Sequence, residues 1–437
     1  MPEGASSDSA RGVILDARPV ELYQQPPEAE IYQANPALLA IPSGRLVAAI
    51  HLHGPGVKKL PGPKGRLYPH HHLVQTRIII SRDKGETWQV TADLPFAFVR
   101  LFRDGETLYA LGHKGNLMAA RSFDGGTTWS KPEPLTPENE QGGLFTQGPA
   151  NTWIHQGFLY AAFMKTRPEP FFGWPGSLLC PVVLKGRLGA NLLSPKAWTF
   201  SEPEKTFAEW FGRTDWPGLG IPFYPTPQPN GRNPIGEGRF APCVGWDDAH
   251  VLGIGDPTHE WYDPSGRSLW VVLRAGVHRS NLAVLLRLTL RGDECPPLLE
   301  PYQAPSGVPF VFLPWPGGHR KFDVLYDDAS RCYWTAAQRV TDSLSRPAAA
   351  SSLKPGLPAD EARALGLYFS KNLVDWSFAG LLTSPRDDLP VQTGPAMAIR
   401  GPDLHVVFRG AGPDCRRLPQ TERILAVRVP DFRSLLY

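Results

Sequence analysis

Two eight-residue stretches of the chain repeat the pattern Ser-x-Asp-x-Gly-x-Thr-Trp. They begin at Ser81 and Ser122, 41 residues apart, and a copy one residue shorter begins at Ser370. The pattern is typical of a tight turn, in which Asp accepts backbone hydrogen bonds, Gly adopts a positive φ and a large Trp ring packs against the turn. The residues expected to build the two full turns are Asp83, Trp88, Asp124 and Trp129. Recurrence at this spacing predicts repeated units the size of one propeller blade.

A second repeated phrase consists of an apolar run, a short turn and another apolar run. Six copies occur, at residues 37–50, 99–111, 153–163, 261–273, 322–336 and 396–408. Each copy is typical of two adjacent antiparallel strands. Six such pairs, each extended to four strands, predict an all-β fold in which residues 1–437 form a single six-bladed β-propeller domain. Pairing of residues 13–15 with residues 424–427 is expected to close the ring and remove exposed edge strands.

Composition agrees with many short strands. Gly and Pro number 43 and 47 of the 437 residues, too many for an architecture of long helices, and 42% hydrophobic residues suffice for a packed core. Two segments depart from the blade pattern, the Pro-rich residues 213–239 and the low-complexity residues 342–364. Both are interpreted as loop insertions.

Charge and hydropathy restrict the partners. The formal charge of +3 indicates no strong polyanion-binding surface, so nucleic acid is not expected, and no apolar run is long enough to span a membrane. The first twenty residues lack the basic start and apolar run of a secretory signal, which predicts a cytoplasmic protein. A secreted or periplasmic location follows instead if a signal has been removed. No pattern predicts a cofactor or a metal site, and the oligomeric state stays open.

The repeated turns on a predicted six-bladed ring resemble those of the Asp-box, or BNR-repeat, sialidase superfamily, and the resemblance extends over most of the chain. In that superfamily the turns lie away from the catalytic pocket, so Asp83 and Asp124 are expected to be structural. The resemblance implies a sialidase-like glycosidase, a hydrolase that binds carbohydrate. It also implies a site with three substrate-binding arginines, a Tyr nucleophile paired with a Glu, and an Asp that acts as general acid and base.

Two parts of that site have no counterpart in the sequence. The family's first arginine precedes the first inner strand, where this chain has Ala34, and its acid/base Asp would lie within residues 52–75, which contain no Asp or Glu. Histidines crowd this stretch instead, and histidine titrates near neutrality. We expect proton transfer from His70, His71 and His72, and substrate binding by His51 and His53. A solvated turn is the alternative interpretation, and a metal site is a weaker one because no spaced acidic partner lies nearby.

Another part of the family's site has a matching phrase. The Glu that activates the nucleophile precedes the second arginine across a strand, a turn and a strand, and here Glu260 and Arg274 stand fourteen residues apart. Neighbouring antiparallel strands can bring both to one edge of a blade. Candidates for the third arginine position are Arg320 and Lys321. Further substrate contacts are expected from Glu237, Arg239, Asp256, His259 and Arg409. Candidates for the nucleophile are Tyr326, Tyr333 and Tyr368.

The leading functional hypothesis is an exo-acting glycoside hydrolase whose terminal sugar is not an ordinary sialoside, because Ala34 cannot replace a carboxylate-binding arginine. A polysaccharide lyase on uronate-containing glycans is one alternative, with Arg and His neutralising the carboxylate while Tyr or His removes a proton. A non-catalytic glycan- or protein-binding propeller is the other, because loss of catalysis would leave the same two gaps.

Overall fold

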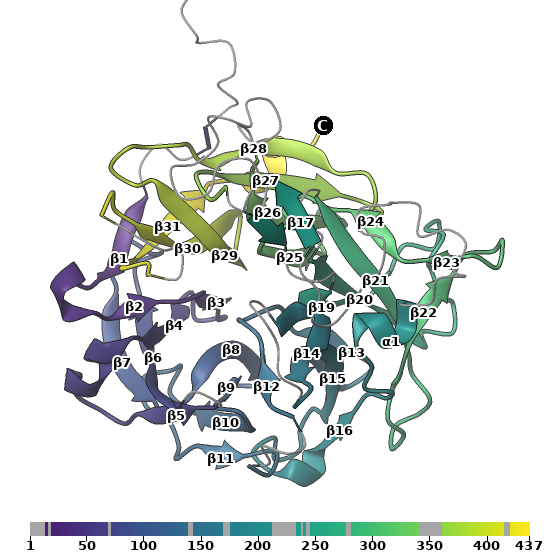
Figure 1. The fold of residues 1–437 in the computed structure, drawn as a ribbon, viewed down its shortest axis with the longest axis horizontal. Coiled ribbons are helices and arrows are strands. Elements are labelled where there is room, and N and C mark those ends of the chain that lie inside the picture. Colours follow the sequence, from purple (N-terminus) through teal and green to yellow (C-terminus); the bar gives the residue numbers. More distant parts are fainter. Residues whose placement is uncertain are drawn as a thin grey trace, which may run out of the picture.

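Six antiparallel sheets are arranged radially around a central axis (Figure 1). The computed structural model describes residues 14–15, 19–68, 71–138, 143–168, 175–211, 233–236, 239–241, 245–276, 281–340, 361–414 and 420–437. We number the sheets as blades 1 to 6 in chain order. The expectation of an all-β, six-bladed β-propeller is confirmed.

Each blade has four strand positions that follow one another outward from the axis. The innermost strands are β3 (Ala37–Ala40), β8 (Ala97–Asp104), β19 (Trp246–Leu252), β25 (Phe322–Asp327) and β29 (Val391–Arg400), and in blade 3 this position is shared by β12 (Phe145–Thr146) and β13 (Trp153–His155). The second strands are β4 (Leu46–His53), β9 (Thr107–His113), β14 (Phe158–Thr166), β20 (Ser268–Ala275), β26 (Cys332–Gln338) and β30 (Asp403–Ala411). The third strands are β6 (His72–Ser81), β10 (Leu117–Ser122), β15 (Leu179–Arg187), β21 (Leu282–Thr289), β27 (Leu365–Ser370) and β31 (Arg423–Val429). The outermost strands are β7 (Gln89–Leu94), β11 (Glu133–Pro134), β16 (Trp198–Phe200), β22 (Leu298–Gln303), β28 (Ser377–Thr383) and β1 (Val20–Gln24).

Short elements extend the blades. Four strands add to blade sheets: β2 (Tyr32–Gln33), β5 (Gly65–Leu67), β23 (Pro309–Phe310) and β24 (Phe312–Pro314). The described connections contain one short helix, α1 (Phe207–Phe211), and the 3-10 turns η1 (Pro27–Ala29), η2 (Pro55–Lys59), η3 (Pro175–Leu178) and η4 (Pro195–Ala197). A further 3-10 turn, η7 (Phe432–Leu435), follows β31. Within the described part of the chain, no helix has the length and apolar character needed to cross a membrane.

The two segments predicted as loop insertions are only partly described. The first, 213–239, lies outside the described residues up to position 232. Its end forms β17 (Asn233–Gly236), which pairs with β18 (Arg239–Ala241) in a separate two-stranded sheet. The expectation that the whole segment is loop is therefore wrong at its end. Pro234 can lie in this strand because it is in a two-stranded sheet, where every strand is an edge strand, and next to a register shift. The second segment lies outside the described residues up to position 360.

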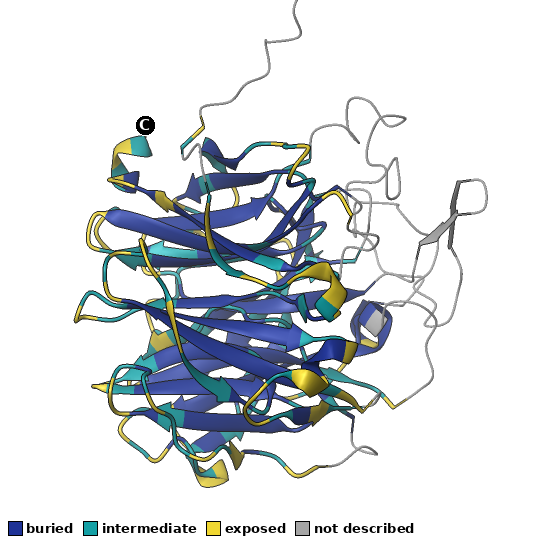
Figure 2. Ribbon diagram, turned by 90° about the vertical axis from the view of Figure 1, so that its left-hand side faces the viewer, coloured by how far each residue is buried: buried dark blue, intermediate teal, exposed yellow. Residues whose placement is uncertain are grey.

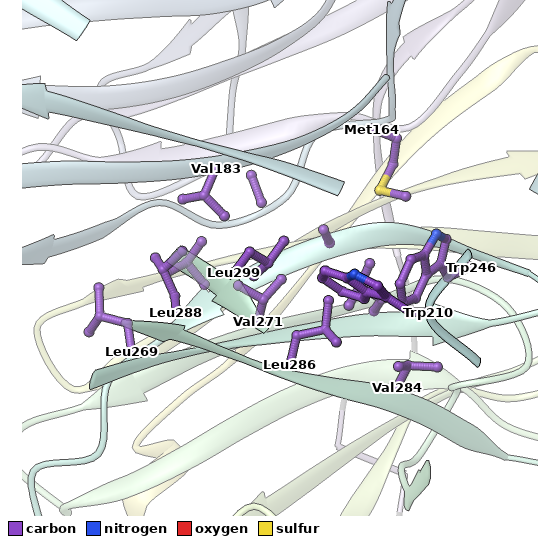
Figure 3. Close-up of a cluster of buried hydrophobic side chains, with 14 of the residues drawn as sticks. Met164, Val183, Trp210, Trp246, Leu269, Val271, Val284, Leu286, Leu288 and Leu299 are labelled. Carbon is purple, nitrogen blue, oxygen red and sulfur yellow. The ribbon is translucent and has the colours of Figure 1, made fainter. Parts of the chain in front are cut away.

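Hydrophobic clusters fill the spaces between neighbouring blades, one at each of the six blade interfaces. Side chains of a strand point alternately to its two faces, so Val271 of β20 packs toward blade 3 and Val272 toward blade 5. Figure 3 shows the cluster between blades 3 and 4, in which the rings of Trp210 and Trp246 lie 5.6 Å apart. The strands are therefore buried on both faces, as the dark blue arrows of Figure 2 show. Burial of both faces explains why the apolar runs are continuous.

The ring is closed by β1, which pairs with β31 in blade 6 and brings Val20 opposite Ala426. The sequence placed residues 13–15 in this role. Instead, Ile14 forms a parallel bridge with Leu381 of blade 5, and the Leu15 N–H donates to the Leu381 carbonyl at 2.8 Å. The closing strand therefore lies several residues further along than predicted, because a strand in this position must match the register of the Arg423–Ala426 edge.

The repeated turns connect the third and outermost strands of blades 1, 2 and 5. In the two full copies, the first carboxylate oxygen of Asp83 or Asp124 accepts a hydrogen bond from the backbone N–H four residues on, at 2.9 and 2.8 Å. The indole N–H groups of Trp88 and Trp129 donate to a glycine carbonyl of the same turn, at 3.1 and 3.0 Å. The turns therefore satisfy their own backbone groups and hold the outermost strand in place.

Candidate active site

One face of the propeller carries a pocket on the axis to which all six blades contribute. It forms where inner strands begin and second strands end, because antiparallel pairing brings these positions together. The inner strands surround this axis in Figure 1. The pocket has a volume of about 280 Å³. We call it the mouth pocket, and it is lined by Asn35, Phe98, Thr146, Gln147, Gly148, Asp247, Asp248, Arg274, Arg320, Lys321, Thr393 and Arg409.

Three inner strands are bulged at the mouth pocket. The pairing register shifts near the start of β8, β19 and β29, and the residues in these bulges have positive φ, 52° at Phe98, 51° at Asp248 and 65° at Gly394. A bulge re-aims side chains relative to the regular pleat, and positive φ is uncommon for residues other than glycine. At Gly394, an added Cβ would lie 2.2 Å from Asn35 Oδ1, so the packing of Asn35 requires glycine there.

Two adjacent carboxylates stand at the centre of the site. The β19 bulge presents Asp247 and Asp248, which are 5% and 4% exposed. Arg274, on the neighbouring strand, contacts both: its Nη2 lies 3.3 Å from Asp247 Oδ2 and its Nη1 lies 3.6 Å from Asp248 Oδ2. Lys321 Nζ lies 3.7 Å from the other oxygen of Asp248.

This environment separates the two carboxyl pKa values. Burial and then the charge of Asp248 raise the pKa of the Asp247 carboxyl to about 7. Burial alone would also raise the pKa of Asp248, but the positive charges of Lys321 and Arg274 outweigh it and lower that pKa. One buried carboxyl therefore retains its proton at a pH where its neighbour is ionised, which is the arrangement that acid–base chemistry on one substrate requires.

Three arginines reach the mouth pocket from three successive blades. Arg274 lies near the end of the second strand of blade 4, Arg320 precedes the inner strand of blade 5, and Arg409 lies on the second strand of blade 6. Asn35 and Arg409 both lie close to Gly394, because a Cβ placed on Gly394 would lie 2.2 Å from Asn35 Oδ1 and 3.3 Å from Arg409 Nε. Asn35 directly follows Ala34 in the chain, so Arg409 lies beside the segment that carries Ala34. Of the residues expected to bind substrate, these three arginines and Lys321 line the pocket.

Two of the predicted histidines lie beside the pocket in a stack of rings. The His51 ring is buried and lies 5.7 Å from the His53 ring and 4.2 Å from the Phe98 ring. The stack continues to His113, whose ring lies 5.5 Å from that of Phe98. Burial, with the neighbouring histidines, holds the pKa of His51 well below its usual value, and burial lowers the pKa of His113 to about 4. The His51 and His113 rings are therefore uncharged at neutral pH.

The three consecutive histidines do not line the pocket as a group. His70 lies outside the described residues. His71 is exposed, with a φ of 52° and its ring 4.7 Å from that of Tyr68. His72 is exposed at the start of β6, in a hairpin with β5. The β5–β6 hairpin exposes His71 and His72 to solvent outside the pocket lining, and the expectation that this run supplies acid–base chemistry stays a prediction.

Glu260 lies on the opposite face of the propeller. Since β19 begins at the mouth pocket, its connection to β20 is on the other side, and Glu260 is exposed in that connection. Asp256 is exposed there too and accepts a hydrogen bond from the Thr258 N–H at 2.9 Å. His259 Nε2 donates to the Asn372 carbonyl at 2.7 Å, which ties the connection to blade 5. The expected site roles of these three residues are corrected, because the inner strand is β19 and not the stretch that follows Glu260.

The predicted tyrosine nucleophiles also lie away from the mouth pocket. Tyr326 and Tyr333 face each other across the far ends of β25 and β26, with ring centroids 4.8 Å apart. Tyr333 donates to the Gly253 carbonyl at 2.5 Å, and its burial raises its pKa. Tyr368 packs on Phe378 in the outer part of blade 5. Among the described residues that line the pocket there is no tyrosine, so these three assignments are corrected.

Two further expectations stay predictions. Glu237 lies outside the described residues, and Arg239 is placed in β18 without a described side chain.

Within the described ranges, no three His, Cys, Asp or Glu side chains gather in a way that could hold a metal ion.

The sequence reasoning missed the two carboxylates. Asp247 and Asp248 form an acidic doublet near the start of β19, between Trp246 and Ala249. Charged residues are rarely buried without partners, so a doublet inside an apolar strand signals a site. The repeated phrase predicts the strand pair of blade 4 at residues 261–273, whereas the structure forms it from β19 and β20, so the doublet falls before the predicted pair.

Comparison with known proteins identifies the fold. No protein-family model and no curated protein matches the sequence. Among solved structures, an intramolecular trans-sialidase from Ruminococcus gnavus, in complex with oseltamivir carboxylate, aligns with a TM-score of 0.53 and 10% identity over 98% of this chain and 100% of that chain. A Hadza microbial sialidase aligns with a TM-score of 0.51 and 11% identity over 91% of this chain and 66% of that chain. An α-L-arabinanase from Penicillium chrysogenum, in complex with arabinobiose, aligns with a TM-score of 0.50 and 12% identity over 96% and 99%.

The chain thus has a six-bladed β-propeller fold, which it shares with enzymes named for action on different sugars. At identities of 10–12% the likeness concerns the fold. Function has to be derived from the side chains in the mouth pocket.

Proposed function

We propose that the protein is a glycan-active enzyme, an exo-acting glycoside hydrolase that removes a terminal sugar bearing a carboxylate. The observation that carries this proposal is the convergence of the Asp247 and Asp248 pair with three arginines in one pocket. Glycoside hydrolysis generally requires two acid groups in different protonation states. The structural relatives support a glycan as the substrate class, since two are named sialidases and one an arabinanase.

The two carboxyl groups have separable roles in this proposal. Asp247, whose pKa is raised, donates its proton to the leaving-group oxygen. Asp248, held ionised by Lys321 and Arg274, acts as base toward water or as nucleophile toward the anomeric carbon. Arg274 bridges both carboxylates and keeps them oriented while the proton moves.

The arginines argue for an acidic sugar. Guanidinium groups bind carboxylates through paired, charge-assisted hydrogen bonds. Arg320 and Arg409 flank the pocket, and Arg409 supplies from blade 6 the guanidinium that the family pattern would place at Ala34. A pocket of about 280 Å³ is at the small end of ligand sites, of roughly 300 Å³ and above, which favours one terminal ring over an internal chain segment. The repeated turns act as structural Asp boxes in this proposal.

The test is turnover of a panel of chromogenic glycosides, including sialosides, uronides and arabinosides, by the wild type and by Asp247→Asn. The variant should lose 10²-fold or more in kcat, a size of effect typical of roughly 10² to 10⁴ for a general acid, and keep its melting temperature. Wild-type kcat/KM should rise as Asp248 ionises, below the ordinary Asp range, and fall above about pH 7 as Asp247 loses its proton. Glu260→Gln, on the opposite face, is the matched control and should retain full activity.

Three results would contradict the proposal. Full activity in Asp247→Asn would remove the acid from this pair. An unsaturated product absorbing in the ultraviolet would identify a lyase. Binding on a glycan array without turnover of any substrate would identify a binding propeller.

A further inference from the structure

A second pocket lies between blades 4 and 5, away from the propeller axis. Its volume is about 530 Å³, within the usual range of ligand sites, roughly 300–1,000 Å³. We call it the interblade pocket, and among the residues that line it are Asn281, Gly317, Arg339, Tyr368, Trp376 and Phe378. Gly317 and the mouth-pocket residue Arg320 belong to one turn, in which the Arg320 N–H donates to the Gly317 carbonyl at 2.8 Å. The two pockets therefore flank a single turn.

Three half-buried aromatic rings line the interblade pocket. Trp376 belongs to the repeated turn of blade 5, and its ring lies 4.7 Å from the ring of the buried Trp315. The rings of Tyr368 and Phe378, on the adjacent strands β27 and β28, lie 5.3 Å apart. Each ring is thus held by another ring while part of it stays exposed. Rings fixed in this way offer apolar faces against which sugar rings can stack.

A glycine in β27 makes room for the ring of Tyr368. Side chains two residues apart on a strand lie on the same face, and a Cβ added to Gly366 would lie 2.8 Å from Tyr368 Cε2 and 2.9 Å from its hydroxyl oxygen. The ring therefore lies back along the strand, over Gly366. Burial raises the pKa of the Tyr368 hydroxyl, although the nearby charge of Arg339 opposes this, so the hydroxyl keeps its proton at neutral pH and can donate a hydrogen bond.

Arg339 adds a positive charge to this group of rings. Its guanidinium carbon lies 4.3 Å from the centre of the Phe378 ring. In the part of the chain that the structure describes, no carboxylate forms an ion pair with this half-buried side chain. A guanidinium that packs on an aromatic ring keeps N–H donors for a carboxylate. The interblade pocket therefore combines apolar rings with a cation that matches an acidic ligand.

We propose that the interblade pocket binds an acidic oligosaccharide, with sugar rings against Trp376, Tyr368 and Phe378 and a carboxylate paired with the Arg339 guanidinium. Charge complementarity selects an acidic glycan over a neutral one. The aromatic rings select a sugar over an inorganic anion. This inference rests on the proposed function, because a glycan held beside the mouth pocket keeps its terminal sugar at a high local concentration there.

Glycan binding to the Asp247→Asn chain, which prevents turnover, tests the interblade pocket directly. The probes are sialyl and uronyl oligosaccharides, with neutral oligosaccharides of the same length, on a glycan array. Calorimetry then gives the Kd of the acidic oligosaccharide that binds best. Arg339→Gln combined with Phe378→Leu should raise this Kd about tenfold or more relative to that of the acidic monosaccharide, as expected for one lost charge-assisted hydrogen bond.

The matched control is Arg121→Gln combined with Phe123→Leu. These residues form a similar pair, with the guanidinium carbon 4.9 Å from the ring centre, but line neither the mouth pocket nor the interblade pocket. The control should bind every probe as the parent chain does.

Kinetics on the chain with Asp247 intact distinguish this inference from the proposed function. Arg339→Gln with Phe378→Leu should raise the KM for the acidic oligosaccharide relative to the KM for a small chromogenic glycoside. An unchanged ratio of the two KM values, with normal hydrolysis, would reject the interblade pocket and leave the proposed function standing. Binding that depends on Arg339 and Phe378 without hydrolysis of any substrate would do the reverse.

Three further results would overturn the interblade pocket as an acidic-glycan site. The first is that no acidic oligosaccharide binds to the Asp247→Asn chain. The second is that neutral oligosaccharides bind as tightly as acidic ones. The third is a dimer in analytical ultracentrifugation that Arg339→Gln with Phe378→Leu dissociates, which would assign the pocket to a second copy of the chain.

Discussion

At the scale of single residues, burial decides which side chains near the axis carry charge. His51 and His113 belong to a residue type that titrates near neutrality, yet burial lowers the pKa of each. Asp247 belongs to a type that is normally ionised, yet burial raises its pKa. The group that titrates near neutral pH at the mouth pocket is therefore a carboxyl and not an imidazole.

Away from the mouth pocket, the pKa of the buried His405 predicts how the stability of the protein depends on pH. Burial lowers its pKa from 6.5 to about 4. Between these two values the unfolded chain binds more protons than the folded one, so stability should be complete above pH 6.5 and fall as the pH drops toward 4. The expected loss is up to about 3 kcal/mol at about 1.4 kcal/mol per pKa unit. His405→Gln cannot titrate, and urea unfolding at successive pH values should show a flatter dependence for this variant. Parallel curves for the two proteins would show that His405 makes no such contribution.

At the scale of elements, two kinds of irregular feature, the strand bulges and the repeated turns, have separate roles. The bulges of β8, β19 and β29 lie at the mouth pocket and aim side chains into it. The repeated turns lie at the other ends of the blades and join the third strands to the outermost ones. A change in a turn should therefore affect stability, whereas a change in a bulge should affect the site.

Asp124→Ala should lower the melting temperature without changing kcat or KM. Asp124 accepts hydrogen bonds from the Thr128 N–H at 2.8 Å and from the Thr128 hydroxyl at 2.7 Å, and their loss should cost about 1 kcal/mol, as for a helix cap. Asp387→Ala is the control, because Asp387 is exposed and its 3.8 Å ion pair with Arg363 should contribute little. An altered KM in Asp124→Ala would mean that the turn communicates with the pocket.

At the scale of the whole molecule, the mouth pocket depends on closure of the ring. Its lining comes from positions as distant as Asn35 and Arg409. Blades 1 and 6 are held together by the pairing of β1 with β31 and by a hydrophobic cluster between the two blades. Opening this interface would separate Asn35 from Arg409 and expose an unpaired strand edge.

A disulfide across the closing strands tests this dependence. Val20 and Ala426 are directly opposite partners, so Val20→Cys combined with Ala426→Cys should form an intramolecular bond on oxidation. Closing so long a loop should stabilise the oxidised form by about 4 kcal/mol or more over the reduced form of the same variant. Unfolding curves with and without reductant measure the difference, and peptide mapping checks the bond. Failure to form the bond would place β1 elsewhere.

The repeated turns, the six strand pairs and the continuous apolar runs predict the blades from sequence, because turn chemistry and strand periodicity are local properties. The resemblance to the Asp-box sialidase superfamily pointed to Arg274, Arg320 and Lys321, and the place of Arg409 at the end of a strand pointed to that residue; all four line the mouth pocket.

Only the tertiary structure decided which carboxylates join them. A shift of one strand, or one extra residue in a bulge, reverses the face that a side chain occupies. This is how Asp247 and Asp248 came to the pocket while Glu260 went to the opposite face. Burial, which sets the pKa values of these groups, likewise exists only after six blades far apart in sequence have packed around one axis.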